Sequence, residues 1–157
     1  MCRRVRPLID TAFRETWPAI SPDGRWIAYT SNESGREEVY VRPSPDVGRG
    51  RWQVSTDGGK MPRWTKRGRE LVFRRGSDLA GEFWVSAIQP GASYGAGRPT
   101  QIAGVANSSN DYDIAADGRL LVTMPTGGTD VEASRPRIVV VQNWFDELKA
   151  RVPTTPR

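Results

Sequence analysis

Histidine is absent from this 157-residue chain, and cysteine occurs once, as Cys2. Without histidine, the sequence lacks the usual general base of serine and cysteine hydrolases and the commonest neutral metal ligand. A single cysteine cannot form a disulfide within the chain, so cysteine usage does not indicate a redox compartment. From the residue types that remain, we expect no catalytic residue, no metal and no cofactor.

Long apolar runs are missing as well. No segment has the run of about 18 apolar residues that indicates a membrane-spanning helix. The first residues, Met1-Cys2-Arg3-Arg4, lead into no apolar core of the kind that a signal peptide requires. We therefore expect a soluble domain, either cytoplasmic or periplasmic according to the protein that carries it.

Turn-forming and aromatic residues are abundant instead. The chain has 16 Gly, 12 Pro and 6 Trp but only 37% hydrophobic residues, a balance typical of turn-rich β structure. Its 23 Lys and Arg against 18 Asp and Glu give a net charge of +5, which favours acidic partners only weakly. The length suffices for one domain with a core.

The segment Thr16–Thr30 contains the unit on which the chain is built. Its centre, Ser21-Pro22-Asp23-Gly24, predicts a tight turn, because proline presets φ to about −65° and glycine accepts the positive φ that follows. After the turn, residues 26–30 alternate with the two-residue period of a β-strand. The segment therefore predicts a β-hairpin.

This unit occurs three times, with turn glycines at Gly24, Gly68 and Gly118. Each glycine is followed by an arginine and by an expected strand; these strands are residues 26–30, 70–74 and 120–124. Further strands are expected at residues 39–41, 83–85 and 138–141, and then at 52–55 and 100–102. Four short antiparallel strands in roughly 40–50 residues correspond to one β-propeller blade.

The predicted fold is all-β, a partial β-propeller of about three four-stranded antiparallel blades with a short C-terminal helix. The blades are expected at residues 17–55, 56–103 and 104–142. Residues 1–16, with Pro7-Leu8-Ile9 at their centre, are expected to form a strand left from a preceding blade.

Residues 143–152 have the apolar spacing of a helix, with an asparagine at the N-cap position and charges matched to the helix dipole. Residues 153–157 are expected to form a disordered tail. Closed propellers have roughly four to eight blades. Three blades therefore predict either the end of a longer protein or two copies that close a ring by self-association.

The hairpin sequence Ser21–Tyr29 resembles the WD40-like, TolB-type (PD40) propeller repeat. The order of the longer pieces Glu15–Arg42, Ser55–Gly59 and Asn143–Lys149 is similar to the C-terminal propeller of many bacterial serine/threonine protein kinases and of TolB-family proteins. The resemblance covers nearly the whole chain and implies a six-bladed type of sensor or protein-binding module. The second and third repeats lack the Ser-Pro start but keep the glycine, and the chain has no kinase signature.

Two patterns suggest active or metal sites. Gly91-Ala92-Ser93-Tyr94-Gly95 matches a nucleophile elbow, which needs a strand-to-helix turn and a histidine, whereas this run lies in an expected loop, residues 89–98. Calcium sites need about six converging oxygens, which spaced acids before a hairpin do not supply. We interpret these acids as strand-edge and turn residues; they are Asp111, Asp113, Asp117 and Asp130.

Six cations surround the turn of the second repeat: Arg63, Lys66, Arg67, Arg69, Arg74 and Arg75. A nucleic-acid site would need exposed aromatic residues among them, but Trp64 and Phe73 fall where the other repeats have core residues. We predict a solvated basic blade edge, with binding to an acidic protein surface as the second interpretation. Nucleic acid is disfavoured.

Five of the six tryptophans divide into two groups. Trp17, Trp64 and Trp84 occupy repeat positions and are predicted to pack between blades, whereas Trp26 and Trp52 are candidates for exposed anchors of a partner.

We expect a non-catalytic protein-interaction or sensor module, the C-terminal part of a TolB-like propeller from or related to a kinase-linked bacterial protein. It would bind a protein or peptide partner. The alternative is the propeller of a prolyl-oligopeptidase-like peptidase, where it would gate substrate access.

Overall fold

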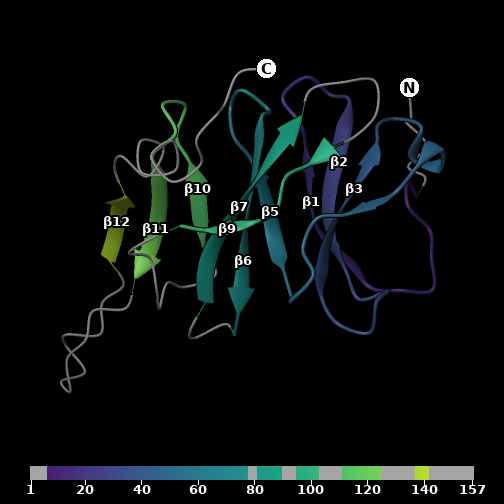
Figure 1. The fold of residues 1–157 in the computed structure, drawn as a ribbon, viewed down its shortest axis with the longest axis horizontal. Coiled ribbons are helices and arrows are strands. Elements are labelled where there is room, and N and C mark those ends of the chain that lie inside the picture. The colour runs from purple at the N-terminus through teal and green to yellow at the C-terminus, as the bar shows by residue number, and fades with distance from the viewer. Residues whose placement is uncertain (1–6, 78–80, 90–94, 103–110, 125–136, 142–157) are drawn as a thin grey trace, which may run out of the picture.

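The computed structural model describes residues 7–77, 81–89, 95–102, 111–124 and 137–141. Three antiparallel sheets stand side by side in it (Figure 1). In this part of the chain no helix has the length and hydrophobicity needed to cross a membrane.

The first sheet has the strand order β1-β2-β3-β4. Its strands are β1 (Glu15–Ile20), β2 (Trp26–Ser31), β3 (Glu38–Pro43) and β4 (Trp52–Gln53), with a short 3₁₀ helix, η1 (Val47–Arg49), before the last. All neighbouring strands are antiparallel, so the chain builds this sheet by successive reversals.

The second sheet has the order β5-β6-β7-β8, and β9 also pairs with β7. The strands are β5 (Lys60–Trp64), β6 (Glu70–Gly76), β7 (Gly81–Gln89), β8 (Gly95–Ala96) and β9 (Thr100–Gln101). The expected loop at residues 89–98 is therefore partly strand. Because β7 continues to Gln89, its end offers hydrogen-bonding groups to which β8 pairs.

The third sheet has the order β10-β11-β12, formed by β10 (Tyr112–Ile114), β11 (Leu120–Met124) and β12 (Arg137–Val141). The predicted all-β partial propeller is thus what the structure shows. The predicted C-terminal helix, residues 143–152, and the tail, residues 153–157, lie outside the described residues.

The predicted leading strand does not form in the described part of residues 1–16. Residues 7–14 are irregular, and β1 begins at Glu15. A strand is stable only where a neighbour satisfies its backbone N–H and C=O groups. The last strand of a blade needs the strand before it, and no such strand lies beside residues 7–14 among the residues described.

Each of the three repeat turns contains the same backbone hydrogen bond. The N–H groups of Gly24, Gly68 and Gly118 donate to the carbonyl oxygens three residues earlier, at 2.8, 2.8 and 2.9 Å. The same glycines have positive φ angles of 72°, 63° and 88°, which residues with a side chain rarely adopt. The glycine pattern therefore predicted these turns correctly.

The core lies between the sheets. Alternate residues of each strand point to opposite faces, so the middle sheet contributes to two interfaces. Toward the first sheet it presents Leu71, Phe73 and Ile88, which pack on Ala28, Val39, Val41 and Val54. Toward the third sheet it presents Val72, Phe83 and Val85, which pack on Tyr112, Leu120 and Val122. Face-to-face stacking is therefore what holds the sheets together.

The third sheet breaks the repeat by one residue. In the first two hairpins the bond that closes the turn spans five residues, from Ser21 N to Trp26 O and from Thr65 N to Glu70 O, whereas Ala115 N binds Arg119 O. A slip of one residue reverses the two faces of a strand. Leu121 is consequently 37% exposed, although the repeat aligns it with the buried Leu71.

Candidate interaction surfaces

The outer face of the first sheet is the side turned away from the second sheet. The cross-strand pairs Ile20–Ile27 and Tyr29–Tyr40 on this face repeat the pairs Trp64–Leu71 and Phe73–Trp84 of the second sheet. Those second-sheet residues face the first sheet and are covered by it. The outer face therefore repeats a surface that, one sheet along, lies in an interface.

Arginines cover the middle of the outer face. Tyr29 and Tyr40 are 2% and 3% exposed, and their rings stack with centroids 6.0 Å apart. Arg42 lies over the Tyr29 ring and donates from Nε to the hydroxyl oxygen at 2.7 Å, while Arg51 lies over Tyr40. Burial raises the pKa of Tyr29. The two phenol rings are thus fixed in place.

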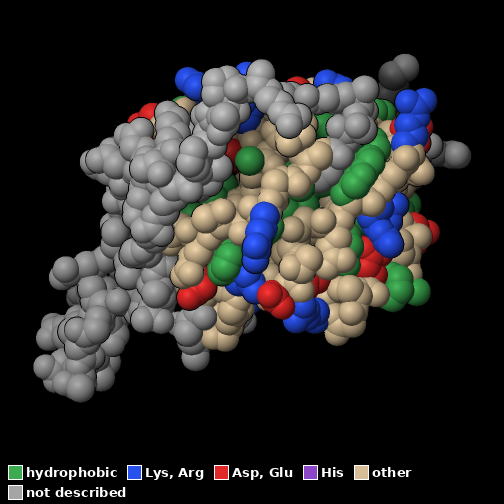
Figure 2. All heavy atoms as spheres, in the orientation of Figure 1, with side chains coloured by type: hydrophobic (Ala, Val, Ile, Leu, Met, Phe, Trp, Pro, Cys, Tyr) green, Lys and Arg blue, Asp and Glu red, His purple; other side chains and the backbone are tan. Residues whose placement is uncertain are grey.

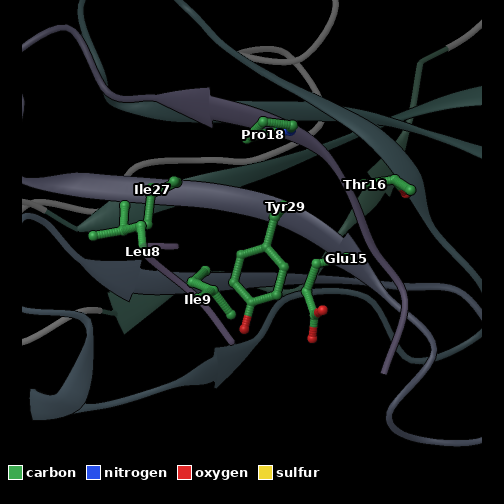
Figure 3. Close-up of a pocket in the computed structure, with 7 residues that line it drawn as sticks. All are labelled: Leu8, Ile9, Glu15, Thr16, Pro18, Ile27 and Tyr29. Carbon is green, nitrogen blue, oxygen red and sulfur yellow. The ribbon is translucent and has the colours of Figure 1, made fainter. Parts of the chain in front are cut away.

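Residues 7–14 cover a further part of the outer face. Leu8 and Ile9 reach over Ile27 and Tyr29 and enclose with them a small, mostly apolar pocket of about 150 Å³ (Figure 3). The segment is attached through Arg14, whose N–H donates to Asn32 Oδ1 at 2.9 Å. A drug-sized ligand needs roughly 300 Å³ or more, so this pocket can take one side chain at most.

Large apolar side chains remain exposed on this face and on its covering segment. Ile20 is 63% exposed, whereas Trp64 at the same repeat position packs on the core and donates from Nε1 to Ala19 O at 3.0 Å. Leu8 and Phe13 are 49% and 48% exposed. Leu8 and Ile20 both adjoin Ile27, and we call these two residues the apolar patch. Phe13 lies beyond the other end of β1, away from them.

The prediction that Trp17 packs between blades is wrong. This residue is 41% exposed and belongs to neither core cluster, whereas the equivalent Met61 is 3% exposed. Both residues have left-handed φ angles, 56° and 58°, where the pairing with the next strand shifts register. Because both residues lie in the same kind of bulge, the backbone does not account for the difference: Met61 packs in the core between the second and third sheets, and Trp17 packs in neither core cluster.

The four other tryptophans that the structure describes line the interface between the first two sheets. Trp64 and Trp84 pack there as predicted. Trp26 and Trp52 are not exposed anchors: both are half-buried against the same core, edge to face with ring centroids 5.7 Å apart. Their indoles extend the apolar core toward solvent.

The six cations of the second repeat do not form one patch. Arg74 is completely buried, with its guanidinium against Gly81. Arg75 lies 4.1 Å from the centroid of the Trp84 ring and binds Asp57, and Arg63 lies over the ring of Tyr112. The exposed members are Lys66, Arg67 and Arg69.

The spaced acids do not converge. Asp113 accepts from the N–H of Ile114, and Asp117 accepts from Arg119 N and Nε at 3.1 and 2.8 Å. The backbone N–H of Arg119 holds the pKa of Asp117 below its ordinary value. No three potential metal ligands gather within the described ranges. Asp130 and residues 91–94 of the elbow-like motif lie outside those ranges.

A buried carboxylate that sequence reasoning missed joins the first two sheets. Glu38 is 1% exposed and accepts hydrogen bonds from Ser55 Oγ, from Arg36 Nε at 2.7 Å and from Gly58 N at 2.9 Å. Ser55 and Gly58 belong to the linker between the sheets. The sequence did contain a signal for this buried carboxylate, namely a charged residue immediately before the apolar run 39–41. A carboxylate in such a buried strand must be paired.

No protein-family model and no curated protein matches the chain. Among solved structures it resembles an acylaminoacyl peptidase of Pyrococcus horikoshii, with a TM-score of 0.52 and 18% identity over 75% of this chain and 19% of that one. It also resembles the β-propeller domain of the trilobed protease from Pyrococcus furiosus, with a TM-score of 0.50 and 16% identity over 82% of this chain and 43% of that one.

TolB from Acinetobacter baumannii is similar with a TM-score of 0.45 and 15% identity, over 83% of this chain and 44% of that one. The chain thus spans less than half the length of each of these proteins. At such identities the likeness shows the fold alone, which is that of a β-propeller.

Proposed function

We propose that this chain is a non-catalytic protein-interaction module, part of a TolB-like β-propeller related to those attached to bacterial serine/threonine protein kinases. The observation that carries the proposal is the outer face of the first sheet. It has the composition of an interface between sheets, yet the apolar patch on it is exposed. Covering such a surface with another protein surface lowers the free energy.

A second copy of this chain is the occupant that the repeat favours. The equivalent face of the second sheet is covered by the first sheet of the same chain. Every copy therefore contains a sheet of the kind that packs on such a face. Two copies joined in this way would continue the stack and could complete a ring.

The expected affinity is low. Side chains that are about half exposed contribute on the order of 1 kcal/mol each when covered, against about 8 kcal/mol for a micromolar complex. The two residues of the apolar patch therefore supply only about a quarter of that free energy. Association should accordingly depend strongly on protein concentration.

Sedimentation velocity over a wide concentration range tests this proposal. The wild-type chain should shift from monomer toward dimer as its concentration rises, and Ile20→Glu should shift the equilibrium back because it places a charge in the interface. Ala116→Glu adds the same charge at an exposed turn of the third sheet and is the matched control. A wild-type chain that stays monomeric throughout, or an Ile20→Glu variant that associates as wild type does, would contradict the proposal.

A second candidate is the propeller part of a prolyl-oligopeptidase-like peptidase, where it would gate substrate access. The likeness of fold to an acylaminoacyl peptidase and to the propeller domain of a protease favours it. The adjoining coding sequence separates the two candidates. Kinase signatures there would support the first, and a G-x-S-x-G motif followed by Asp and His would support the second.

A further inference from the structure

Four exposed cations gather at one end of the second sheet. Lys66, Arg67 and Arg69 lie in the turn between β5 and β6, and Arg98 follows β8. The backbone brings the two groups together, because Ile88 N donates to Arg69 O and Gly97 N donates to Ala87 O, each at 2.7 Å. Arg69 and Arg98 therefore flank the end of β7. We call these four residues the basic end.

The two segments that carry the basic end contain little opposing charge. Glu70 is the only acid in residues 65–70 and 87–98, and it is 9% exposed. No residue of the basic end makes an ion pair with any residue that the structure describes. Elsewhere arginines do so, as Arg49 does with Asp46 and Arg119 with Asp117. In the view of Figure 2, several Lys and Arg side chains likewise lie beside Asp or Glu.

The turn of the second repeat also lacks the stabilising aspartate that the other two repeats have. In the first repeat, Asp23 accepts hydrogen bonds from Ser21 Oγ at 2.6 Å and from Arg25 N at 3.1 Å. In the third repeat, Asp117 accepts the second kind of bond, from Arg119 N at 3.1 Å. The equivalent position in the second repeat is Arg67. An arginine cannot accept these bonds, so turn stability does not account for its presence.

The backbone that carries the basic end is held firmly. A Cβ added at Gly68 would lie 3.4 Å from Pro22 Cδ, so the second turn packs against the first. Thr65 N also donates to Glu70 O at 3.0 Å and closes the turn. Cations on a fixed backbone lose less entropy on binding than cations on a loose loop.

We propose that the basic end binds an acidic segment of a partner protein through its carboxylates. Carboxylates suit arginine because the guanidinium donates two parallel hydrogen bonds to them. Nucleic acid fits less well, because it would need exposed aromatic rings for its bases. Phe73 is fully buried, and Trp64 is held by its bond to Ala19 O. This inference deepens the proposed protein-binding role and rests on it.

Fluorescence anisotropy with defined probes tests the inference. The probes are a labelled peptide of alternating glutamate and glycine, the same peptide with glutamine in place of glutamate, and a labelled oligothymidine of equal charge, all at low ionic strength. The test variant is Arg67→Asp, which restores the turn carboxylate of the other repeats and should not lower stability. The matched control is Arg49→Asp, which makes the same change of charge on the first sheet.

We expect the wild-type chain to bind the glutamate peptide and not the glutamine peptide, and added salt to weaken binding. Arg67→Asp should weaken it by about tenfold and Arg49→Asp by about twofold at most. Absence of glutamate-peptide binding, equal weakening by both variants, or Arg67-dependent binding that is tighter for oligothymidine would overturn the inference. Ile20→Glu leaves the basic end intact, so this inference and the self-association proposal fail in separate experiments.

Discussion

Glu38 is the buried charge on which the junction of the first two sheets depends. Its carboxylate takes three hydrogen bonds, one from Arg36 and two from the linker residues Ser55 and Gly58. Glu38→Gln should lower the free energy of unfolding by about 1–3 kcal/mol, because an amide removes the negative charge that Arg36 Nε contacts and turns one acceptor into a donor. Urea denaturation followed by tryptophan fluorescence measures this loss.

Glu37→Gln is the matched control for Glu38→Gln. Glu37 makes only a surface ion pair with Arg14, at 3.5 Å, with both side chains well exposed. Exposed pairs contribute roughly 0–1 kcal/mol, so this variant should stay close to wild type. Equal losses in the two variants would show that the buried network contributes no special stability.

Single residues also mark the limit of sequence reasoning. Lys66, Arg67 and Arg69 are exposed as predicted, but Arg74, in the same basic run, is completely buried. Residue type gives the average exposure of arginine, whereas burial depends on which strand face a neighbouring sheet covers. Trp17 was mispredicted as well: its bulge also occurs at the buried Met61, so neither the repeat position nor the backbone shows which of the two side chains is covered.

At the scale of single elements, the hairpin turns depend on glycine. Gly24 has φ of 72°, and a Cβ added there would meet nothing within 4 Å. Gly24→Ala should therefore cost about 1 kcal/mol through backbone strain alone, and Gly24→Asn less, because asparagine tolerates left-handed φ. In thermal denaturation, the melting temperature should be highest for the wild type, lower for Gly24→Asn and lowest for Gly24→Ala.

Gly48→Ala is the control for the turn variants. Gly48 does not have positive φ, and an added Cβ would meet Asp46 Oδ1 at an ordinary 3.6 Å. This variant should be as stable as wild type or slightly more so. A Gly24→Ala variant that matches Gly48→Ala would contradict the role assigned to the left-handed turn residue.

Elements were predictable where their cause is local. The turns at Gly24, Gly68 and Gly118 follow from glycine chemistry within four residues, and the strands beside them from the two-residue period. β8 and the register of the third sheet were not predictable in this way, because both depend on hydrogen bonds to another strand. In the described residues 7–14 the expected leading strand does not form, and no neighbouring strand lies beside them in the described part of the chain.

At the scale of the whole molecule, the sheets are joined by polar contacts as well as by apolar faces. Tyr112 on β10 is buried, packs edge to face on Phe83 at 4.8 Å, and donates its hydroxyl to the carbonyl oxygens of Met61 and Val72 in the second sheet. The third sheet is thereby attached to both β5 and β6. The sequence placed Tyr112 in the third repeat, but it gave no indication of this contact.

Burial raises the pKa of Tyr112, and the sign of its effect on stability follows. In the unfolded chain the phenol loses its proton above about pH 10, whereas the folded chain retains it. The unfolded state then binds fewer protons, so the free energy of unfolding falls as pH rises beyond that value. Below it, this titration does not change stability with pH.

Tyr112→Phe should therefore have two effects. Near neutral pH it should lower the free energy of unfolding by about 1 kcal/mol, because the carbonyl oxygens of Met61 and Val72 lose a donor. Above about pH 10 the free energy of unfolding of the variant should fall less steeply with pH than that of the wild type. The slope that remains comes from other groups such as Tyr29, because burial raises its pKa as well. Urea denaturation at neutral and alkaline pH measures both effects, and parallel pH dependences of the two proteins would show that the ionisation of Tyr112 does not contribute to the loss of stability at high pH.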